Sequence, residues 1–319
     1  MAIIIPSGSN YCIDGACGTY FWGVHSHDSI WHISLAEVAF RKIPFISPIY
    51  AGASLGGYNM LLDLVIFLLS KIGVSPLVAF FKILPLVWFV LFSYATISLS
   101  KTIHKSWGYV LSLLIFMFFG GSFFYFITLY HSGSISGSGS MSAMQSGIMM
   151  TNLQLAFSFV LLMAQLALVY KKKWSYGVII LLAFLTSVQF ALKFYGGIIS
   201  VFLLGFYLFE YLAKTKKFTR FISYSLISSL MVLLTFYLFY DPFTTLKSDS
   251  GFVFSPFSTV RAIIEEPTMF YLPDMVNARY YLQSVNSLSP RLLMIEIFSA
   301  FLYVAFNLGT RFFGIAYVL

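Results

Sequence analysis

Long apolar runs alternate with short polar connections along most of the chain. A helix needs about 20 largely apolar residues to cross a bilayer, and from residue 76 onward the sequence repeatedly supplies runs of about that length. These runs predict seven spans, at Pro76–Ser100, Trp107–Tyr130, Asn152–Tyr170, Trp174–Gln189 (extended by Phe190, Ala191 and Leu192), Phe194–Leu212, Phe221–Tyr240 and Leu292–Ala316. The pattern therefore predicts an all-α, polytopic membrane protein with about seven transmembrane helices.

The composition supports this fold class and excludes others. Apolar residues make up 59% of the 319 positions and charged residues only 9%, against roughly 25% charged residues in ordinary globular proteins. A soluble fold of this size could not cover its surface with so few charges, so most of that surface must face lipid. The net charge of +8 does not indicate nucleic acid, because Lys and Arg stand in short clusters between apolar runs and form no basic recognition patch.

The positive clusters also predict the orientation. Three connections carry basic residues and no acidic ones: Lys101 and Lys105; Lys171, Lys172 and Lys173; Lys214, Lys216, Lys217 and Arg220. They alternate through the predicted spans, so all three can lie on the cytoplasmic side, where such residues accumulate. The protein is thus predicted to be a multi-pass protein of the cell (plasma) membrane, with residues 1–75, 131–151 and 241–291 on the extracytoplasmic side.

This topology divides the chain into four parts. Residues 1–75 form an extracytoplasmic first loop, 76–240 a bundle of six spans, 241–291 a second large extracytoplasmic loop, and 292–319 the last span. Because no span precedes the first loop and no polar tail follows the last one, we expect a fragment that lacks its first span and is truncated at its end.

Two short juxtamembrane helices are predicted within the first loop. Asp28 can cap a helix over Ser29–Arg41, since its carboxylate can accept backbone N–H groups of the first turn. The second helix, Tyr58–Ile72, carries a narrow polar stripe of Asn59, Asp63 and Ser70, which favours a position in the membrane interface. Asp63 could line the site along this stripe or face water, and we expect it to face water.

Three features of the extracytoplasmic loops allow more than one interpretation. Cys12 and Cys17 could form a small-loop disulfide if the segment is extracytoplasmic, or remain free thiols. His25, His27 and Asp28, with His32 one helical turn beyond Asp28, could bind a divalent metal; alternatively Asp28 is only a helix cap and the histidines are interfacial polar side chains. The Gly/Ser-rich loop 131–151 is either a mobile linker or a loop that orders over a substrate, with His131 at its root.

Several short motifs resemble the GT-C superfamily of integral-membrane glycosyltransferases, and in particular a group of bacterial GT-C-type proteins. The motifs are His-Asp-Ser-Ile-Trp-His-Ile-Ser-Leu-Ala-Glu at 27–37, Pro48…Gly52…Tyr58, Leu-Lys-Phe-Tyr-Gly-Gly at 192–197, and Glu265-Glu266-Pro267…Tyr271…Ala278-Arg279. The resemblance extends from about Gly23 to Arg279. The superfamily includes the protein mannosyltransferases, in which an acidic residue of the first outer loop precedes a short helix and an interfacial helix.

The resemblance implies transfer of a sugar from a polyprenyl-phosphate-linked donor to a glycan, lipid or protein acceptor at the outer membrane surface. The catalytic acid maps onto Asp28, which would activate the acceptor hydroxyl or help to bind a metal. Lys193 and Arg279 are the candidate cations for the leaving phosphate. His27, His32, Glu265 and Glu266 complete the candidate substrate-binding residues, and a divalent ion, Mg²⁺ or Mn²⁺, remains open as a cofactor.

Other readings stay open at this point. Lys193 could extend only to lipid headgroups, and Arg279 could pair with Glu265, Glu266 or Asp274. The protein could instead be a transporter or channel, which would be expected to carry ionisable residues within its spans, or a non-catalytic membrane subunit with a His/Asp metal site.

Overall fold

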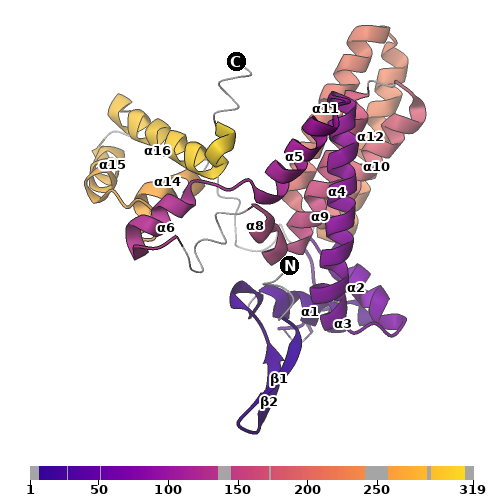
Figure 1. Ribbon diagram of the computed structural model, residues 1–319. Coiled ribbons are helices and arrows are strands. Elements are labelled where there is room, and N and C mark those ends of the chain that lie inside the picture. The colour runs from indigo at the N-terminus through magenta and orange to yellow at the C-terminus, as the bar shows by residue number, and fades with distance from the viewer. Residues whose placement is uncertain are drawn as a thin grey trace. The chain divides into compact units, whose positions relative to one another are not determined.

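The computed structural model describes residues 7–26, 28–50, 52–135, 145–171, 174–240, 258–285 and 289–312. It forms two compact units, which are described separately. Unit 1 comprises residues 1–114 and 149–250, and unit 2 comprises residues 115–148 and 251–319. Helices dominate both (Figure 1), which confirms the prediction of an all-α, polytopic membrane protein. The four predicted parts were defined by their position relative to a membrane, so these units do not test them.

Within the described residues, five helical segments are long and apolar enough to cross a membrane. They are α3–η3–α4 (Pro76–Val78, Ala79–Ile83, Leu84–Ile103), α9 (Leu153–Tyr170), α11 (Phe194–Thr215), α12 (Phe218–Tyr240) and α16–η4 (Pro290–Leu308, Gly309–Arg311). Two further apolar helices are shorter, α5 (Trp107–Phe119) and α10 (Tyr176–Leu192). As predicted, the short run that starts at Trp174 does continue as helix to Leu192.

The predicted span Trp107–Tyr130 is wrong as a single helix. It breaks after α5, and the chain resumes as α6 (Phe124–Ser132). Gly120 and Gly121 stand at the break, and glycine is a poor helix former. The Phe123 N–H donates to the carbonyl oxygen of Phe306 at 2.7 Å, so the backbone at the break bonds to α16 instead of continuing the helix.

Both short helices of the first loop are present in unit 1. A 3₁₀ turn, η1 (Gly23–Ser26), leads into α1 (Asp28–Val38), which continues as η2 (Ala39–Arg41). The second helix, α2 (Leu61–Lys71), has eleven residues and a length of about 17 Å, against about 30 Å of hydrocarbon in a bilayer. It is too short to cross, in agreement with the prediction.

A β-hairpin that the pattern of apolar runs does not predict precedes η1. Strands β1 (Ser9–Ile13) and β2 (Ala16–Tyr20) pair antiparallel, with Cys12 opposite Cys17, and these two cysteines form a disulfide. Asp14 and Gly15 form the turn with φ of 51° and 84°, which is the left-handed conformation that Asp-Gly hairpin turns require. The hairpin projects from the end of unit 1 that carries α1 to α3 (Figure 1). Of the two alternatives for the cysteines, the structure has the disulfide.

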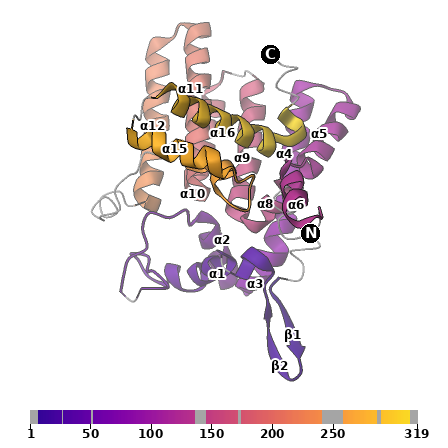
Figure 2. The same cartoon turned by 90° about the vertical axis from the view of Figure 1, so that its left-hand side faces the viewer.

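Interhelical hydrogen bonds show how the helices of unit 1 run. Trp88 Nε1 donates to the carbonyl oxygen of Ala156 at 3.0 Å, so the beginnings of α4 and α9 lie together. Ser200 Oγ donates to Gln165 Oε1 at 2.7 Å, which sets α11 parallel to α9. Because α10 and α12 return in the opposite direction, the basic connections after α4, α9 and α11 all lie at one end of the unit, and α1 to α3 at the other (Figure 2).

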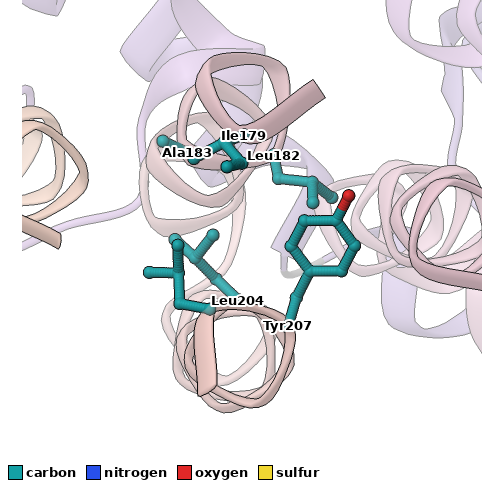
Figure 3. Close-up of a cluster of buried hydrophobic side chains, with 6 residues drawn as sticks. Ile179, Leu182, Ala183, Leu204 and Tyr207 are labelled. Carbon is teal, nitrogen blue, oxygen red and sulfur yellow. The ribbon is translucent and has the colours of Figure 1, made fainter. Parts of the chain in front are cut away.

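Close packing between these helices fixes the start of α11. Figure 3 shows Ile179, Leu182 and Ala183 of α10 packed against Leu204 and Tyr207 of α11, and all five are buried. Nearer the start of α11, a Cβ atom on Gly196 would lie only 2.1 Å from Ser158 Oγ of α9. The missing side chain therefore lets α9 and α11 approach closely, just after Lys193.

Unit 2 is built around a short buried helix, α14 (Ser258–Glu265). It packs against α16 and α15 (Pro273–Val285), with Ile263 and Ile264 almost fully buried. Where the chain passes from unit 2 back to unit 1 it forms α8 (Gln145–Thr151).

Candidate functional site

Asp28 and Lys193, 165 positions apart in the sequence, lie close together in unit 1. Asp28 is the first residue of α1 and is exposed, whereas Lys193 is half-buried between α10 and α11. Burial lowers the pKa of the Lys193 amino group, and the negative charge of Asp28 partly offsets this by raising it. The carboxylate therefore acts on the ammonium electrostatically, at the end of the unit opposite the basic connections.

The backbone at Lys193 explains why its side chain lies there. Lys193 is extended, with φ −158° and ψ 119°, and it separates two helices. Its N–H still bonds to the carbonyl oxygen of Gln189 at 2.7 Å, and the Phe194 N–H donates to Asn59 Oδ1 at 3.3 Å. Lys193 is thus the residue that immediately precedes α11, and helix N-termini favour anions. The positive charge of Lys193 and the start of α11 both suit an anionic group such as a phosphate.

A buried polar network lies beneath α1. His32 Nδ1 donates to Asp63 Oδ1 at 3.0 Å, and Gln154 Nε2 donates to Asp63 Oδ2 at 3.2 Å. Asp63 is completely buried, so the expectation that it faces water is wrong. The polar stripe of α2 is turned towards α1 and α9, and the protein replaces water as its hydrogen-bonding partner. Burial raises the pKa of Asp63, and the hydrogen bond from His32 lowers it in part.

The same network reaches the Lys193 junction through Asn59. Gln154 Nε2 also donates to the Asn59 carbonyl oxygen at 2.7 Å. The Tyr240 hydroxyl lies 3.0 Å from Asn59 Oδ1 and 2.7 Å from the carbonyl oxygen of Phe190. Hydrogen bonds thus link Asn59 to α9, to the start of α11 and, through Tyr240 of α12, to the end of α10, next to Lys193.

Tyr58 also belongs to the site. The sequence indicated this residue only as the start of a predicted helix and as part of a motif. Its ring centroid lies 6.1 Å from that of His32. Burial raises the pKa of Tyr58 to about 12, and the charges of Asp63 and Asp28 add to the effect. The phenol therefore stays protonated at neutral pH, within the field of both carboxylates.

The predicted metal ligands are only partly covered by the structure. His25 is buried, with Nδ1 2.8 Å from Ser7 Oγ and Nε2 3.3 Å from the carbonyl oxygen of Met150. Since a carbonyl oxygen only accepts, Nε2 carries the proton and Nδ1 accepts from the Ser7 hydroxyl. Neither nitrogen is left for a metal, and burial lowers the pKa of His25.

His27 lies outside the described residues, so the complete set of His25, His27 and Asp28 stays a prediction. Across the part of the chain that the structure describes, no group of three or more His, Cys, Asp or Glu side chains could hold a metal ion. Because His25 does not fit the role of a ligand, we assign no step of the reaction at this site to a metal ion.

The candidates of unit 2 have a structural role. Arg279 is only 3% exposed, and its Nη2 lies 2.5 Å from Glu265 Oε1. Its Nη1 donates to Gln283 Oε1 at 3.0 Å, whereas Glu266 is exposed. The alternative in which Arg279 pairs with Glu265 is thus the one observed. Asp28 belongs to the other unit, so the expected role of Arg279 beside Asp28 as a cation for the leaving phosphate stays a prediction.

Unit 2 contains a second ion pair, which the sequence analysis did not identify. Arg261 Nε lies 2.9 Å from Glu296 Oε2, which joins α14 to the interior of α16. His131, the root of the Gly/Ser-rich loop, hydrogen-bonds through Nε2 to the carbonyl oxygen of Met269. Most of that loop, residues 136–144, lies outside the described residues, so whether it is a linker or a substrate loop is not tested.

Comparison with known proteins does not assign the chain to a family. No protein-family model matches it, and neither a curated protein nor a solved structure does.

Proposed function

We propose that the protein is a membrane glycosyltransferase of the GT-C type. It would move a sugar from a polyprenyl-phosphate-linked donor to an acceptor on the extracytoplasmic face of the cell membrane. The observation that carries the proposal is that an exposed carboxylate, Asp28, acts electrostatically on a half-buried ammonium, Lys193, at the end of unit 1 opposite the basic connections. The motif resemblance around both residues supports it.

The reaction needs two charges of opposite sign at one place. An acceptor arriving from water can place its hydroxyl oxygen beside Asp28, whose negative charge stabilises the positive charge that develops on this oxygen as it attacks and as its proton leaves to a neighbouring base. That oxygen attacks the anomeric carbon, and the bond between this carbon and the phosphate oxygen breaks with its electron pair leaving on the phosphate. Lys193 and the N-terminus of α11 stabilise the released polyprenyl phosphate. A lipid-linked donor approaches such a site from the bilayer and the acceptor from water.

The disulfide supports an extracytoplasmic site. Disulfides form and persist in oxidising environments and are rare in the cytosol. In unit 1 the hairpin that carries Cys12 and Cys17 is attached beside α1, since Lys82 Nζ donates to the Ser7 carbonyl oxygen at 3.1 Å and Ser7 hydrogen-bonds to His25. The disulfide and Asp28 thus belong to the same end of the unit, and the basic connections to the other, as the positive-inside rule requires.

Turnover of a lipid-linked sugar tests this function. The full chain, reconstituted in liposomes with radiolabelled polyprenyl-phosphate hexoses, is expected to release polyprenyl phosphate and a labelled product. Lys193→Gln should lower kcat by about 10²-fold, since one removed donor to a developing anion costs roughly 3 kcal/mol. Lys71→Gln, at an exposed position on α2, is the matched control and should retain activity. Absence of turnover with every hexose donor would contradict the proposal.

A further inference from the structure

The His32–Asp63 pair is built like an acid–base dyad, and it lies one helical turn from Asp28. We propose that His32 Nε2 takes up the proton of the acceptor hydroxyl and that Asp63 is the residue that positions His32 for this role. The inference rests on the proposed function and deepens it, because it adds the group on which the proton ends.

Asp63 determines which ring nitrogen of His32 is available. Burial raises the pKa of Asp63, but the hydrogen bonds from His32 and Gln154 favour its ionised form. Because an ionised carboxylate only accepts hydrogen bonds, the 3.0 Å contact with Asp63 Oδ1 then places the imidazole proton on Nδ1. The lone pair of the neutral ring then lies on Nε2. Asp63 cannot turn away, because it is completely buried and its second oxygen accepts from Gln154 Nε2 at 3.2 Å.

Stacking fixes the orientation of the His32 ring, while one edge of the ring stays accessible. It stacks on Phe80, with centroids 6.0 Å apart and planes 19° apart. The side chain retains 9% of its exposure, and Nε2 has no hydrogen-bond partner within the described ranges. His25 differs on this point, because both its ring nitrogens are bonded to the protein. Of these two buried histidines, only His32 has a nitrogen available to a substrate.

The surroundings suit a proton acceptor. Among the described residues, the titratable groups that contact His32 are Asp63 from α2 and Tyr58 from the segment before α2, and Asp28 lies one turn earlier on the same helix. Gln154 from α9 and Phe80 from η3 are neutral. Asp63 stabilises the imidazolium once it forms, as the carboxylate of a His–Asp pair does.

The step balances without another reactant. The acceptor O–H bond breaks and its proton passes to Nε2 as the new bond from this oxygen to the anomeric carbon forms. The bond from that carbon to the phosphate oxygen breaks, and its electron pair leaves with the polyprenyl phosphate. The imidazolium then returns its proton to water through the open edge of the ring. A positioned imidazole is the group that most often serves as such a general base.

Carbethoxylation by diethyl pyrocarbonate tests the geometry without any transfer assay, since the reagent modifies the free nitrogen of a neutral imidazole. In the full chain in detergent micelles, peptide mass spectrometry should show His32 modified at least about ten times faster than His25, because the His25 nitrogens are already bonded. Equal, slow modification of both histidines would overturn the proposal.

Kinetics with the lipid-linked donor test the role. His32→Gln should lower kcat by about 10²–10⁴-fold and leave KM for the donor nearly unchanged. Asp63→Asn should also lower kcat, again with KM for the donor nearly unchanged, because the imidazolium loses its counter-charge. His104→Gln, at the opposite end of unit 1, is the control and should change neither.

The outcomes separate this inference from the function on which it rests. Turnover by the wild-type protein, with His32→Gln equally active and its pH profile unchanged, would overturn the role of His32 and leave the glycosyltransferase standing. Complete absence of turnover by the wild-type protein would remove both, and carbethoxylation would then report only whether the dyad geometry exists.

Discussion

Asp28→Asn is expected to abolish sugar transfer while leaving the protein folded in the membrane. The amide has nearly the shape of the carboxylate, and the position is exposed, so the fold should lose little more than the helix-dipole contribution of about 0.3–1 kcal/mol. The negative charge that activates the acceptor and faces Lys193 is lost. We expect kcat to fall about 10³-fold or more, equivalent to roughly 4 kcal/mol in the activation barrier.

The same substitution should change the pH dependence of any residual activity. Asp28 raises the pKa of Lys193 against the lowering effect of burial, so its removal lets that pKa fall further. Because the amino group is charged only below its pKa, the alkaline limb of the profile should move to lower pH. Glu37→Gln, at an exposed position of the same helix, is the matched control. Asp28→Asn activity within about threefold of wild type would rule out the assigned role.

Arg279→Met is expected to destabilise unit 2 strongly. Arg279 is almost fully buried and paired with Glu265, and removal of one partner from a buried ion pair costs about 3–5 kcal/mol because the other charge is left without compensation. The double variant Arg279→Met/Glu265→Gln should recover part of the loss, since it removes the orphaned charge as well. Thermal unfolding in detergent measures both effects.

The same two variants distinguish a structural role of Arg279 from a role in substrate binding. Arg291→Met is the control, because Arg291 is exposed and has no ion pair in the described part of unit 2. If Arg279→Met unfolds like the wild-type protein but loses transfer selectively, the ion pair is not structural and the earlier assignment of Arg279 to the phosphate regains its support.

The sequence predicts the spans well because the physical requirement is simple. A run such as Phe221–Tyr240 is long and apolar, and the helix there, α12, differs only in starting at Phe218. The failures concern backbone chemistry within or outside such runs. Gly120 and Gly121 interrupt an otherwise apolar stretch, and the Asp14-Gly15 turn indicates a hairpin that a search for apolar helices overlooks.

The sequence predicts only some of the residues of the candidate site. Asp28 and Lys193 stand in short polar motifs, which is why they could be named. The burial of Asp63 could not be predicted, because the periodicity of an isolated helix does not say whether its polar stripe faces water or a neighbouring helix. Its partner Gln154 lies 91 positions away, and only the packing of α9 against α2 brings them together.

The central claim is that the site of Asp28 and Lys193 lies on the outer face of the membrane and the basic connections on the inner face. Single-cysteine labelling in intact cells with a membrane-impermeant maleimide tests it most directly, since the two native cysteines are joined in a disulfide and give no background. Ser26→Cys should be labelled from outside, and Lys216→Cys only after the membrane is permeabilised; both positions are exposed in unit 1. Labelling of position 216 in intact cells, with position 26 protected, would invert the topology and contradict the proposed function.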